Sequence, residues 1–373
     1  MIYLDSAATT LQKPKSVLQA MQRATARYAS PGRGGYPAAM EAAEVLYRCR
    51  EQAAELFHAP GPEQVVFTSS ATMALNMAIR SLVKPGMTVV VSGYEHNAVT
   101  RCVSAIPEVT MLVAEGQLFQ PEQLVRSYQR WVNRADVAIC NAVSNVFGYC
   151  LPVADIAALC HRNRVPLIVD ASQAAGCLPV DMAAWGAAYV AMPGHKSLYG
   201  PQGTGILLCA ADANPTPLLY GGTGSQSRDQ AMPDFLPDRL EAGTENVPGV
   251  AGLLEGIRFV GQTGTGRILR HERQLTRWLG QMLRQMERVE VFLAEDAALQ
   301  TGVLSFRVDG MDCEEVGQRL SQAGIAVRTG LHCAPFAHRS AGTLETGTVR
   351  VSTSAFNTQR EVEQTARVLR SFL

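Results

Sequence analysis

The chain of 373 residues carries 33 basic and 33 acidic side chains, so its formal net charge is zero. This balance argues against nucleic acid or an acidic membrane surface as a partner. A hydrophobic fraction of 47% is that of an ordinary globular protein, and the length predicts a sizeable core divided between two domains.

Targeting and membrane segments are not expected. The N-terminal sequence MIYLDSAATT lacks the charged and apolar parts of a signal peptide, and no apolar run approaches the roughly 20 residues that span a bilayer. Nine cysteines without paired spacing leave at least one thiol free, which indicates a reducing, cytoplasmic setting.

The N-terminal region predicts an arm followed by two helices. The first ten residues read as an extended segment that enters a turn. Helices are expected at residues 15–28 and 38–57, and the second one ends before Pro60-Gly61-Pro62, which cannot continue a helix.

From residue 64 the pattern repeats strand, turn and helix. Apolar strands are expected at residues 65–68, 87–91, 109–113, 137–141, 167–170 and 188–192, and residues 205–209 could add an antiparallel strand. Such strands, alternating with helices, predict an α/β fold with a mostly parallel seven-stranded sheet covered on both faces. Functional groups gather at the carboxyl ends of strands in these sheets. Five polar residues follow predicted strands: Thr72, His96, Asn145, Asp170 and Lys196.

The C-terminal third predicts a small α+β domain. A loop at residues 221–247 exceeds the usual connection length and is predicted to be functional or interfacial. Helices are expected at 248–260 and 267–287, followed by strands at 302–308, 325–327 and 348–353 and helices at 313–322 and 359–371. We assign an N-terminal arm to residues 1–14, a large domain to 15–250 and a small domain to 251–373.

Asp170 and Lys196, at neighbouring strand ends, form the most informative pair. A lysine that forms a Schiff base with an aldehyde cofactor must be partly desolvated, so that its neutral amine is accessible. A carboxylate beside a pyridinium nitrogen keeps the ring protonated and makes it a better electron sink. Taken singly, Lys196 could be a solvated loop residue and Asp170 a helix N-cap. Together they predict a site for pyridoxal phosphate.

Two further motifs suit that cofactor. His96 alone is more often an ordinary loop histidine, but beside the pair it is a candidate for ring stacking and proton transfer. Residues 69–72, Ser-Ser-Ala-Thr, open a predicted helix and could bind a phosphate, although ordinary capping explains them as well. No P-loop and no GxGxxG after the first strand occurs, which argues against a nucleotide site.

Cys333 and Arg350 suggest the reaction. Cys333 lies in a predicted loop beside His332 and near Arg328, surroundings that favour the thiolate, whereas the other eight cysteines are expected in the core. Arg350 alternates with apolar neighbours on a predicted strand. An inward arginine needs a carboxylate, either of a substrate or of a structural salt bridge, and the sequence leaves both open.

These motifs together resemble the class V aminotransferase family of pyridoxal phosphate enzymes, and within it the branch of cysteine desulfurases and selenocysteine lyases. Seven pieces in family order carry the resemblance, which spans essentially the whole chain: YLDSAATT, EHNAV, SNVFG, VDASQAAG, GHKSLYGPQGTG, EAGTEN and RTGLHCAP. It implies the fold type I of pyridoxal phosphate-dependent transferases, a homodimer, and L-cysteine or L-selenocysteine as substrate. No metal is expected.

The resemblance also implies a role for each site residue. Lys196 would carry the cofactor, Asp170 would pair with the ring nitrogen, Gln173 would bond the phenolic oxygen and His96 would stack on the ring. The phosphate contacts would come from three positions of the same subunit and one of the partner: Ala71, Thr72 and His195, and Thr244.

For the substrate, the resemblance implies that Asn145 and Arg350 bind the carboxylate, with Arg328 as a helper. Cys333 would attack the substrate sulfur, forming a persulfide that passes to an acceptor protein and releasing alanine. A selenocysteine lyase would use the same residues. The sequence also leaves open a class V aminotransferase or β-lyase without persulfide chemistry, and a non-enzymatic scaffold. The presence of Lys196 with Asp170 argues against the scaffold.

Two positions depart from the family pattern. Pro193 stands where a serine commonly precedes Gly-His-Lys, and Ala71 stands at one place of a threonine pair in the phosphate loop. Phosphate binding should therefore depend more on backbone N–H groups, Thr72, His195 and the partner chain. The short segment after Cys333 resembles the type II branch, so the chain is expected in an outlying subgroup.

Overall fold

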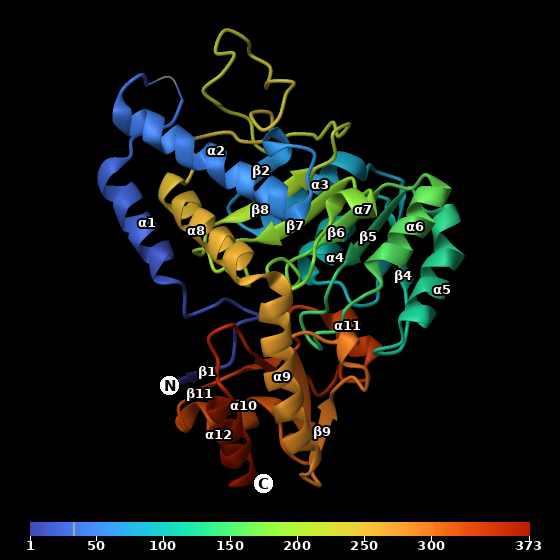
Figure 1. Cartoon of the computed structure of the whole chain (residues 1–373). Coiled ribbons are helices and arrows are strands. Elements are labelled where there is room, and N and C mark those ends of the chain that lie inside the picture. Colours follow the sequence, from blue (N-terminus) through green and yellow to red (C-terminus); the bar gives the residue numbers. More distant parts are fainter. Residues whose placement is uncertain (33) are drawn as a thin grey trace.

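The computed structural model describes residues 1–32 and 34–373. Its larger part is built around a seven-stranded sheet (Figure 1). The strand order is β2-β8-β7-β6-β5-β3-β4, and β8 alone runs antiparallel to its neighbours. The predicted mostly parallel sheet with one reversed strand is confirmed. The strands are β2 (Val65–Thr68), β3 (Thr88–Ser92), β4 (Thr110–Ala114), β5 (Val137–Asn141), β6 (Leu167–Asp170), β7 (Tyr189–Pro193) and β8 (Gly205–Cys209).

Apolar side chains on both faces explain why these strands lie in the interior. Every residue of β5, β6, β7 and β8 is buried. Successive residues of a strand point to opposite faces, so Ile168 joins one core and Val169 the other. The helices that cover the Ile168 face are α3 (Ala71–Leu82) and α4 (Asn97–Ser104), and those on the Val169 face include α5 (Pro121–Trp131), α6 (Val153–Asn163) and α7 (Met182–Trp185).

The two N-terminal helices pack with a helix from much later in the chain. α1 (Lys15–Arg27) and α2 (Pro37–Phe57) both contact α8 (Val247–Thr263). α9 (Thr265–Arg284) begins after the single residue Gly264, whose φ of +84° favours glycine. The predicted break between these helices is therefore only one residue long. α9 leads the chain from α8 to the C-terminal sheet (Figure 1).

A four-stranded antiparallel sheet, in the order β12-β13-β10-β9, forms the C-terminal part. α9, α10 and α12 bury their apolar faces against Leu304, Phe306 and Val351 of this sheet. The elements are β9 (Val289–Phe292), β10 (Val303–Val308), β12 (Arg328–Gly330), β13 (Thr348–Ser352), α10 (Cys313–Gln322), α11 (Pro335–Ser340) and α12 (Gln359–Arg370), and short 3-10 helices cover Pro62–Gln64, Val132–Arg134 and Ala297–Leu299.

The N-terminal arm connects the two sheets. β1 (Ile2–Tyr3) pairs in parallel with β11 (Ile325–Ala326). Asp5 then forms a bridge with Ser352 at the end of β13. Two residues later Ala7 O accepts a hydrogen bond of 2.9 Å from Gln173 Nε2, which follows β6. The arm thus contacts both the C-terminal sheet and the strand ends of the central sheet.

The structure differs from the sequence-based expectations in short elements. β1, β9 and α11 are not predicted, because segments of two to six residues show no clear period. The single strand expected at residues 325–327 is two strands, since β11 pairs with the arm and β12 with β13. The division into domains at residue 250 stays a prediction. Within the described residues, no helix has the length and apolar character to cross a membrane.

Candidate active site

A pocket of about 110 Å³ at the carboxyl ends of the central strands collects most of the predicted site residues. It lies where β5, β6 and β7 end and where α3 and α4 begin. Eight of the twelve predicted residues line it: Ala71, Thr72, His96, Asn145, Asp170, Gln173, His195 and Lys196. The four that lie outside this lining are Thr244, Arg328, Cys333 and Arg350.

Asp170 and Lys196 face this pocket from neighbouring strands. Asp170 ends β6, is 5% exposed, and accepts a hydrogen bond of 2.9 Å from Ser172 N, which fixes its carboxylate. No helix starts at Asp170, so the role of a helix N-cap does not apply to it. Burial lowers the pKa of Lys196 to about 8, against the opposing charge of Asp170. Part of the amine is therefore neutral near neutral pH, as a Schiff-base lysine requires.

His96 caps the start of α4 and is uncharged. Its Nδ1 accepts a hydrogen bond of 3.0 Å from Ala98 N, which leaves the proton of a neutral ring on Nε2. Burial lowers the pKa of His96, although the charge of Asp170 opposes the shift. A neutral ring in a fixed tautomer is suited to stacking on an aromatic cofactor.

Glu95 is a buried residue close to Asp170 that the sequence does not single out. Its Oε1 accepts hydrogen bonds from Ser92 Oγ at 2.8 Å and from Asn141 N at 2.7 Å. Burial, and then the charge of Asp170, raises the pKa of Glu95 to about 8. Glu95 is therefore mostly protonated at neutral pH and adds little negative charge beside Asp170. Its only signal in the sequence is its place before His96 in EHNAV.

The start of α3 and His195 form an end of the pocket that suits an anion. Ser70 caps α3 with its hydroxyl, and Ala71 and Thr72 form the first turn. N–H groups of a first turn have no acceptor inside the helix and lie at its positive end. The Nδ1 of His195 is buried without a partner among the described residues, and burial, with the charges of nearby lysines, lowers its pKa to about 4.

Pro193, one of the two departures from the family pattern, lines the pocket and has neither an N–H nor a hydroxyl to donate.

Thr244 is exposed on the loop between β8 and α8, in a separate pocket of about 220 Å³ that Ser69 and Thr204 also line. Within one chain, Thr244 therefore does not line the pocket of Lys196.

The residues that are present fit pyridoxal phosphate. The carboxylate of Asp170 faces a lysine of lowered pKa, and the helix start with the unpartnered nitrogen of His195 offers donors to a phosphate. Gln173 lines the same pocket and is oriented by its bond to Ala7 O. The chemistry of this donor set matches the two ends of the cofactor.

Arg350 is buried in β13 and already has a carboxylate partner. Its Nη2 donates to Asp5 Oδ1 at 3.0 Å and its Nη1 to Asn145 O at 2.9 Å. Asp5 also accepts from Arg328 Nη2 at 2.9 Å. The structural salt bridge that the sequence leaves open is therefore present. Two guanidinium groups share one carboxylate, and Arg350 Nε is buried without a partner in the described chain, so a second carboxylate can be accommodated.

Cys333 is the one exposed cysteine of the nine. His332 and Cys333 have φ of +49° and +56°, a left-handed conformation that is strained for residues other than glycine. Two hydrogen bonds attach this loop to segments that follow strands of the central sheet: Asn145 Nδ2, after β5, donates to His332 O at 2.7 Å, and Asn97 N, at the start of α4, donates to Cys333 O at 2.7 Å. Asn145 lines the pocket and Asn97 follows the lining residue His96, so the loop is held beside the pocket although Cys333 does not line it.

His332, the neighbour of Cys333 in the sequence, is buried and uncharged. Its ring is buried, with Nε2 at 3.1 Å from Thr348 Oγ1. Burial, reinforced by the charge of Arg350, lowers the pKa of His332 to about 2, so the ring is uncharged. His332 therefore adds no positive charge that would favour the thiolate of Cys333. Arg328, which is half exposed, interacts electrostatically with Cys333.

Comparisons with known proteins point to one family along the chain. The profile of aminotransferase class-V matches residues 2–365. A probable cysteine desulfurase of Methanothermobacter thermautotrophicus is 33% identical over 375 residues, covering 97% of this chain and 92% of that protein. A cysteine desulfurase of Klebsiella pneumoniae subsp. pneumoniae is 31% identical over 382 residues, covering 98% and 91%.

Solved structures show the same fold. The apo cysteine desulfurase of Thermococcus onnurineus NA1 has a TM-score of 0.91 at 29% identity, covering 100% of this chain and 94% of that one. The cysteine desulfurase CsdA (S-sulfonic acid) of Escherichia coli has a TM-score of 0.86 at 26% identity, covering 99% and 94%. The predicted fold type and the predicted family are both confirmed.

Proposed function

The chain belongs to the class-V aminotransferase family of pyridoxal phosphate enzymes, and we propose that it is a cysteine desulfurase that converts L-cysteine to L-alanine and keeps the sulfur as a persulfide on Cys333. The position of Cys333 carries this proposal. It is an exposed thiol on a loop that Asn145 and Asn97 hold beside the pocket of Asp170 and Lys196. An aminotransferase has no use for a nucleophile there.

Pyridoxal phosphate, when bound, supplies an electron sink that stabilises negative charge at the Cα of an amino acid. The carboxylate of Asp170 would hold its ring nitrogen, Gln173 its phenolic oxygen and His96 its ring face. The start of α3 with Thr72, together with His195, would hold its phosphate.

Lys196 is suited to move the Cα proton. Its pKa, lowered to about 8 by burial, lies close to the working pH, so the neutral amine is available as a general base. The charge of Asp170 favours the ammonium form once the proton is taken. Lys196 therefore has both the basicity and the neighbour that this step requires.

Arg350 and Asn145 would hold the substrate carboxylate, with Arg328 as a helper. The cluster around Asp5 keeps a positive charge and an unused, buried N–H at Arg350 Nε, which supports this role. A carboxylate bound by a guanidinium in a buried site is oriented as well as attracted.

The Cys333 thiolate would then attack the sulfur of the bound substrate. A sulfur–sulfur bond forms while the Cβ–sulfur bond breaks. Cβ takes up a proton and Lys196 returns a proton to Cα, so that alanine leaves and one sulfur atom stays on Cys333. A thiol of an acceptor protein would take that sulfur and restore the Cys333 thiol. The exposure of Cys333 supports access by such a partner.

A homodimer is part of this proposal. Large apolar side chains are exposed on α1 and α2 and on the loop before α8, among them Leu18, Met40 and Tyr220. A dimer interface would cover such side chains. Thr244 lies on the same loop, exposed, and would reach the phosphate bound in the partner subunit. Light scattering tests the dimer, and Thr244→Ala should accelerate the loss of pyridoxal phosphate from it.

We also infer a reducing compartment such as the cytoplasm. All nine cysteines are free, and the proposed reaction requires Cys333 to remain a thiol between cycles. The zero net charge supports the absence of a nucleic-acid or membrane partner.

Alanine release from L-cysteine in the presence of a thiol reductant tests the function. Purified protein should show a visible absorption band that borohydride reduction removes, and Lys196→Ala should lack this band. Lys196→Ala and Cys333→Ala should each lower alanine release by at least about a hundredfold. The absence of the band from protein reconstituted with pyridoxal phosphate would contradict the proposal. Conversion of the cofactor to its amine form by an amino acid that leaves as its keto acid would favour an aminotransferase.

The relatives favour sulfur over selenium as the atom removed. Parallel measurements of alanine release from L-cysteine and from L-selenocysteine test this preference. Turnover of L-selenocysteine alone, with L-cysteine inert, would instead identify a selenocysteine lyase.

A further inference from the structure

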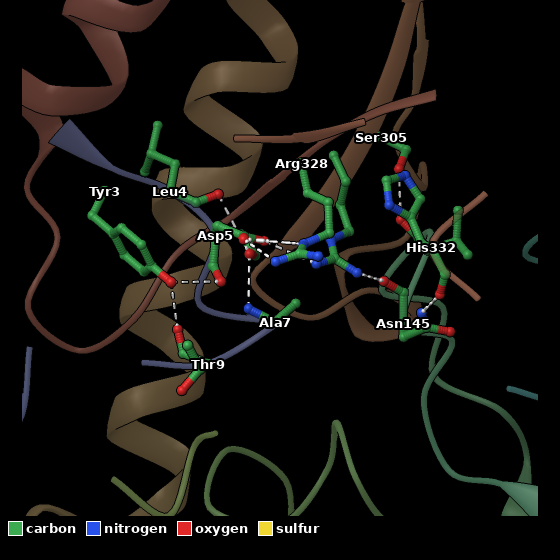
Figure 2. Close-up of polar contacts among 12 residues, drawn as sticks. Tyr3, Leu4, Asp5, Ala7, Thr9, Asn145, Ser305, Arg328 and His332 are labelled. Atoms are coloured by element: carbon green, nitrogen blue, oxygen red, sulfur yellow. Dashed lines mark hydrogen bonds and ion pairs between the residues drawn. The ribbon is translucent and has the colours of Figure 1, made fainter. Parts of the chain in front are cut away.

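Asn145 lies between the residue proposed for the substrate carboxylate and the loop of the proposed nucleophile. Its main-chain oxygen accepts from Arg350 Nη1 at 2.9 Å, and its Nδ2 donates to His332 O at 2.7 Å. Figure 2 shows Asn145 beside His332, with Arg328 and Asp5 on the other side of the cluster. One residue therefore connects the arginine cluster to the Cys333 loop.

The Cys333 loop depends on outside contacts for its position. His332 and Cys333 are consecutive residues in the left-handed conformation. This conformation is strained for both, because neither is a glycine. Within the loop Ala334 N donates to Leu331 O at 2.9 Å, which closes a turn without attaching it to the segments that follow the central strands. That attachment comes from the bonds that the two loop carbonyls accept from Asn145 Nδ2 and Asn97 N.

Of these two donors, only Asn145 uses a side chain that also faces the pocket. It is 7% exposed and lines the pocket together with Asp170 and Lys196. Its Oδ1 is buried without a partner among residues 1–32 and 34–373. A carboxamide has two N–H donors, and His332 O uses one of them. The second can reach a carboxylate while the first holds the loop.

We propose that Asn145 is a positioning residue for Cys333, so that recognition of the substrate carboxylate and placement of the thiol depend on the same side chain. The proposal rests on the proposed function for what the thiol does, whereas the attachment of the loop does not depend on it. Removing the carboxamide should therefore release the loop before any substrate binds. A residue that served only to contact substrate would leave the substrate-free loop unchanged.

Hydrogen exchange of the substrate-free holoenzyme, followed by mass spectrometry, separates these two cases. In Asn145→Ala the peptides that carry Cys333 and Asn97 should exchange about tenfold faster, because the released Cys333 carbonyl no longer protects Asn97 N. Asn145→Asp, which keeps the size but cannot donate, should behave in the same way. In both variants alanine release should show a lower kcat as well as a higher KM.

Ser340→Ala is the matched control. Ser340 Oγ donates to Gly93 O at 3.0 Å and so joins α11 to the end of β3, without touching the loop carbonyls. This variant should leave the Cys333 and Asn97 peptides at wild-type exchange rates. The comparison separates the bond of Asn145 from a general loosening of the segment around Cys333.

Wild-type exchange of both peptides in Asn145→Ala and Asn145→Asp would overturn the proposal. If Asn145→Ala does not fold, Asn145→Ser, whose hydroxyl is too short to reach His332 O, takes its place with the same expected result. A holoenzyme that releases no alanine from L-cysteine, but whose loop is released in these variants, would contradict the proposed function and leave the positioning role intact.

Discussion

Asp5 Oδ1 accepts a hydrogen bond of 3.0 Å from Arg350 Nη2, although the two residues are 345 positions apart in the chain. The N-terminal arm brings Asp5 to the end of β13, where it also binds Arg328. The proposed substrate-carboxylate site is therefore built from both ends of the chain. Because one carboxylate serves two arginines, the site keeps a positive charge for the substrate.

Asp5→Asn should lower the thermal stability of the protein, and a bound amino acid should restore part of that stability. The change keeps the size of Asp5 but leaves the buried Arg350 without a carboxylate, which costs about 3 kcal/mol. Thermal unfolding should show a lower midpoint, and saturating L-alanine should raise that midpoint more than in the wild type. Arg328→Ala, which removes the half-exposed partner, should cost only about 0–1 kcal/mol. Equal midpoints for Asp5→Asn and wild type would contradict this account of the cluster.

Loading of the apoenzyme with pyridoxal phosphate should accelerate as the pH rises through about 8. Burial lowers the pKa of Lys196 to about 8, and only the neutral amine attacks the aldehyde. Below this pKa the rate should rise about tenfold per pH unit, and above it the rate should level off. Stopped-flow absorption measures it. In Asp170→Asn the plateau should begin at lower pH, because the charge of Asp170 raises the pKa of Lys196.

The free energy of unfolding should fall as the pH rises, because Glu272 keeps its proton in the folded chain but loses it in the unfolded chain. It is buried in α9 with Oε1 unbonded in the described structure, and burial raises its pKa to about 8. The folded chain then binds more protons than the unfolded chain between about pH 4.5 and 8, so stability falls across this window. Glu272→Gln removes this term and should stabilise the protein at pH 8.5 by on the order of 2 kcal/mol, with little effect at pH 5.

Glu255→Gln, on the neighbouring α8, is the control for Glu272. Its carboxylate pairs with Arg258 and is partly exposed, so its removal should change stability by only about 0–1 kcal/mol at either pH. Denaturant unfolding of both variants at the two pH values provides the comparison. The same effect of Glu272→Gln at pH 5 and 8.5 would show that proton binding at Glu272 is not the cause.

Glu241 should anchor the loop that carries Thr244. It accepts from Arg50 Nη1 and Nη2 at 2.8 and 2.6 Å and from Phe67 N at 2.6 Å, with little exposure. Glu241→Gln breaks this buried pair, which should cost about 3 kcal/mol and release pyridoxal phosphate severalfold faster from the dimer. Fluorescence of the released cofactor measures the rate. Asp234→Asn, an exposed position on the same loop, should release the cofactor as the wild type does.

Much of the central sheet could be predicted because its signals are local. β5, β6 and β8 carry unbroken apolar runs, and their residue ranges agree with the predicted ones. Asp170 and Lys196 could be paired from the sequence because parallel strand ends meet at one edge of a sheet. Local sequence was thus sufficient to predict that both face one pocket.

The rest of the site depends on contacts between distant segments. The sequence did not show which carboxylate pairs with Arg350, because Asp5 reaches Arg350 only through the N-terminal arm. It did not separate β11 from β12 either, because their pairing partners lie elsewhere in the chain. The burial of His332, which lowers the pKa of its ring, results from tertiary packing and cannot be read from the local sequence. The bond from Asn145 to the Cys333 loop has no counterpart in the sequence pattern.

A single turnover with L-cysteine, without reductant or acceptor, tests the central claim most directly. Intact-mass and peptide analysis should find one added sulfur atom on Cys333 and one alanine released for each added sulfur. Cys333→Ser, which keeps the size of the side chain, should release no alanine above background. Alanine release without added mass on Cys333, or undiminished release from Cys333→Ser, would contradict the account.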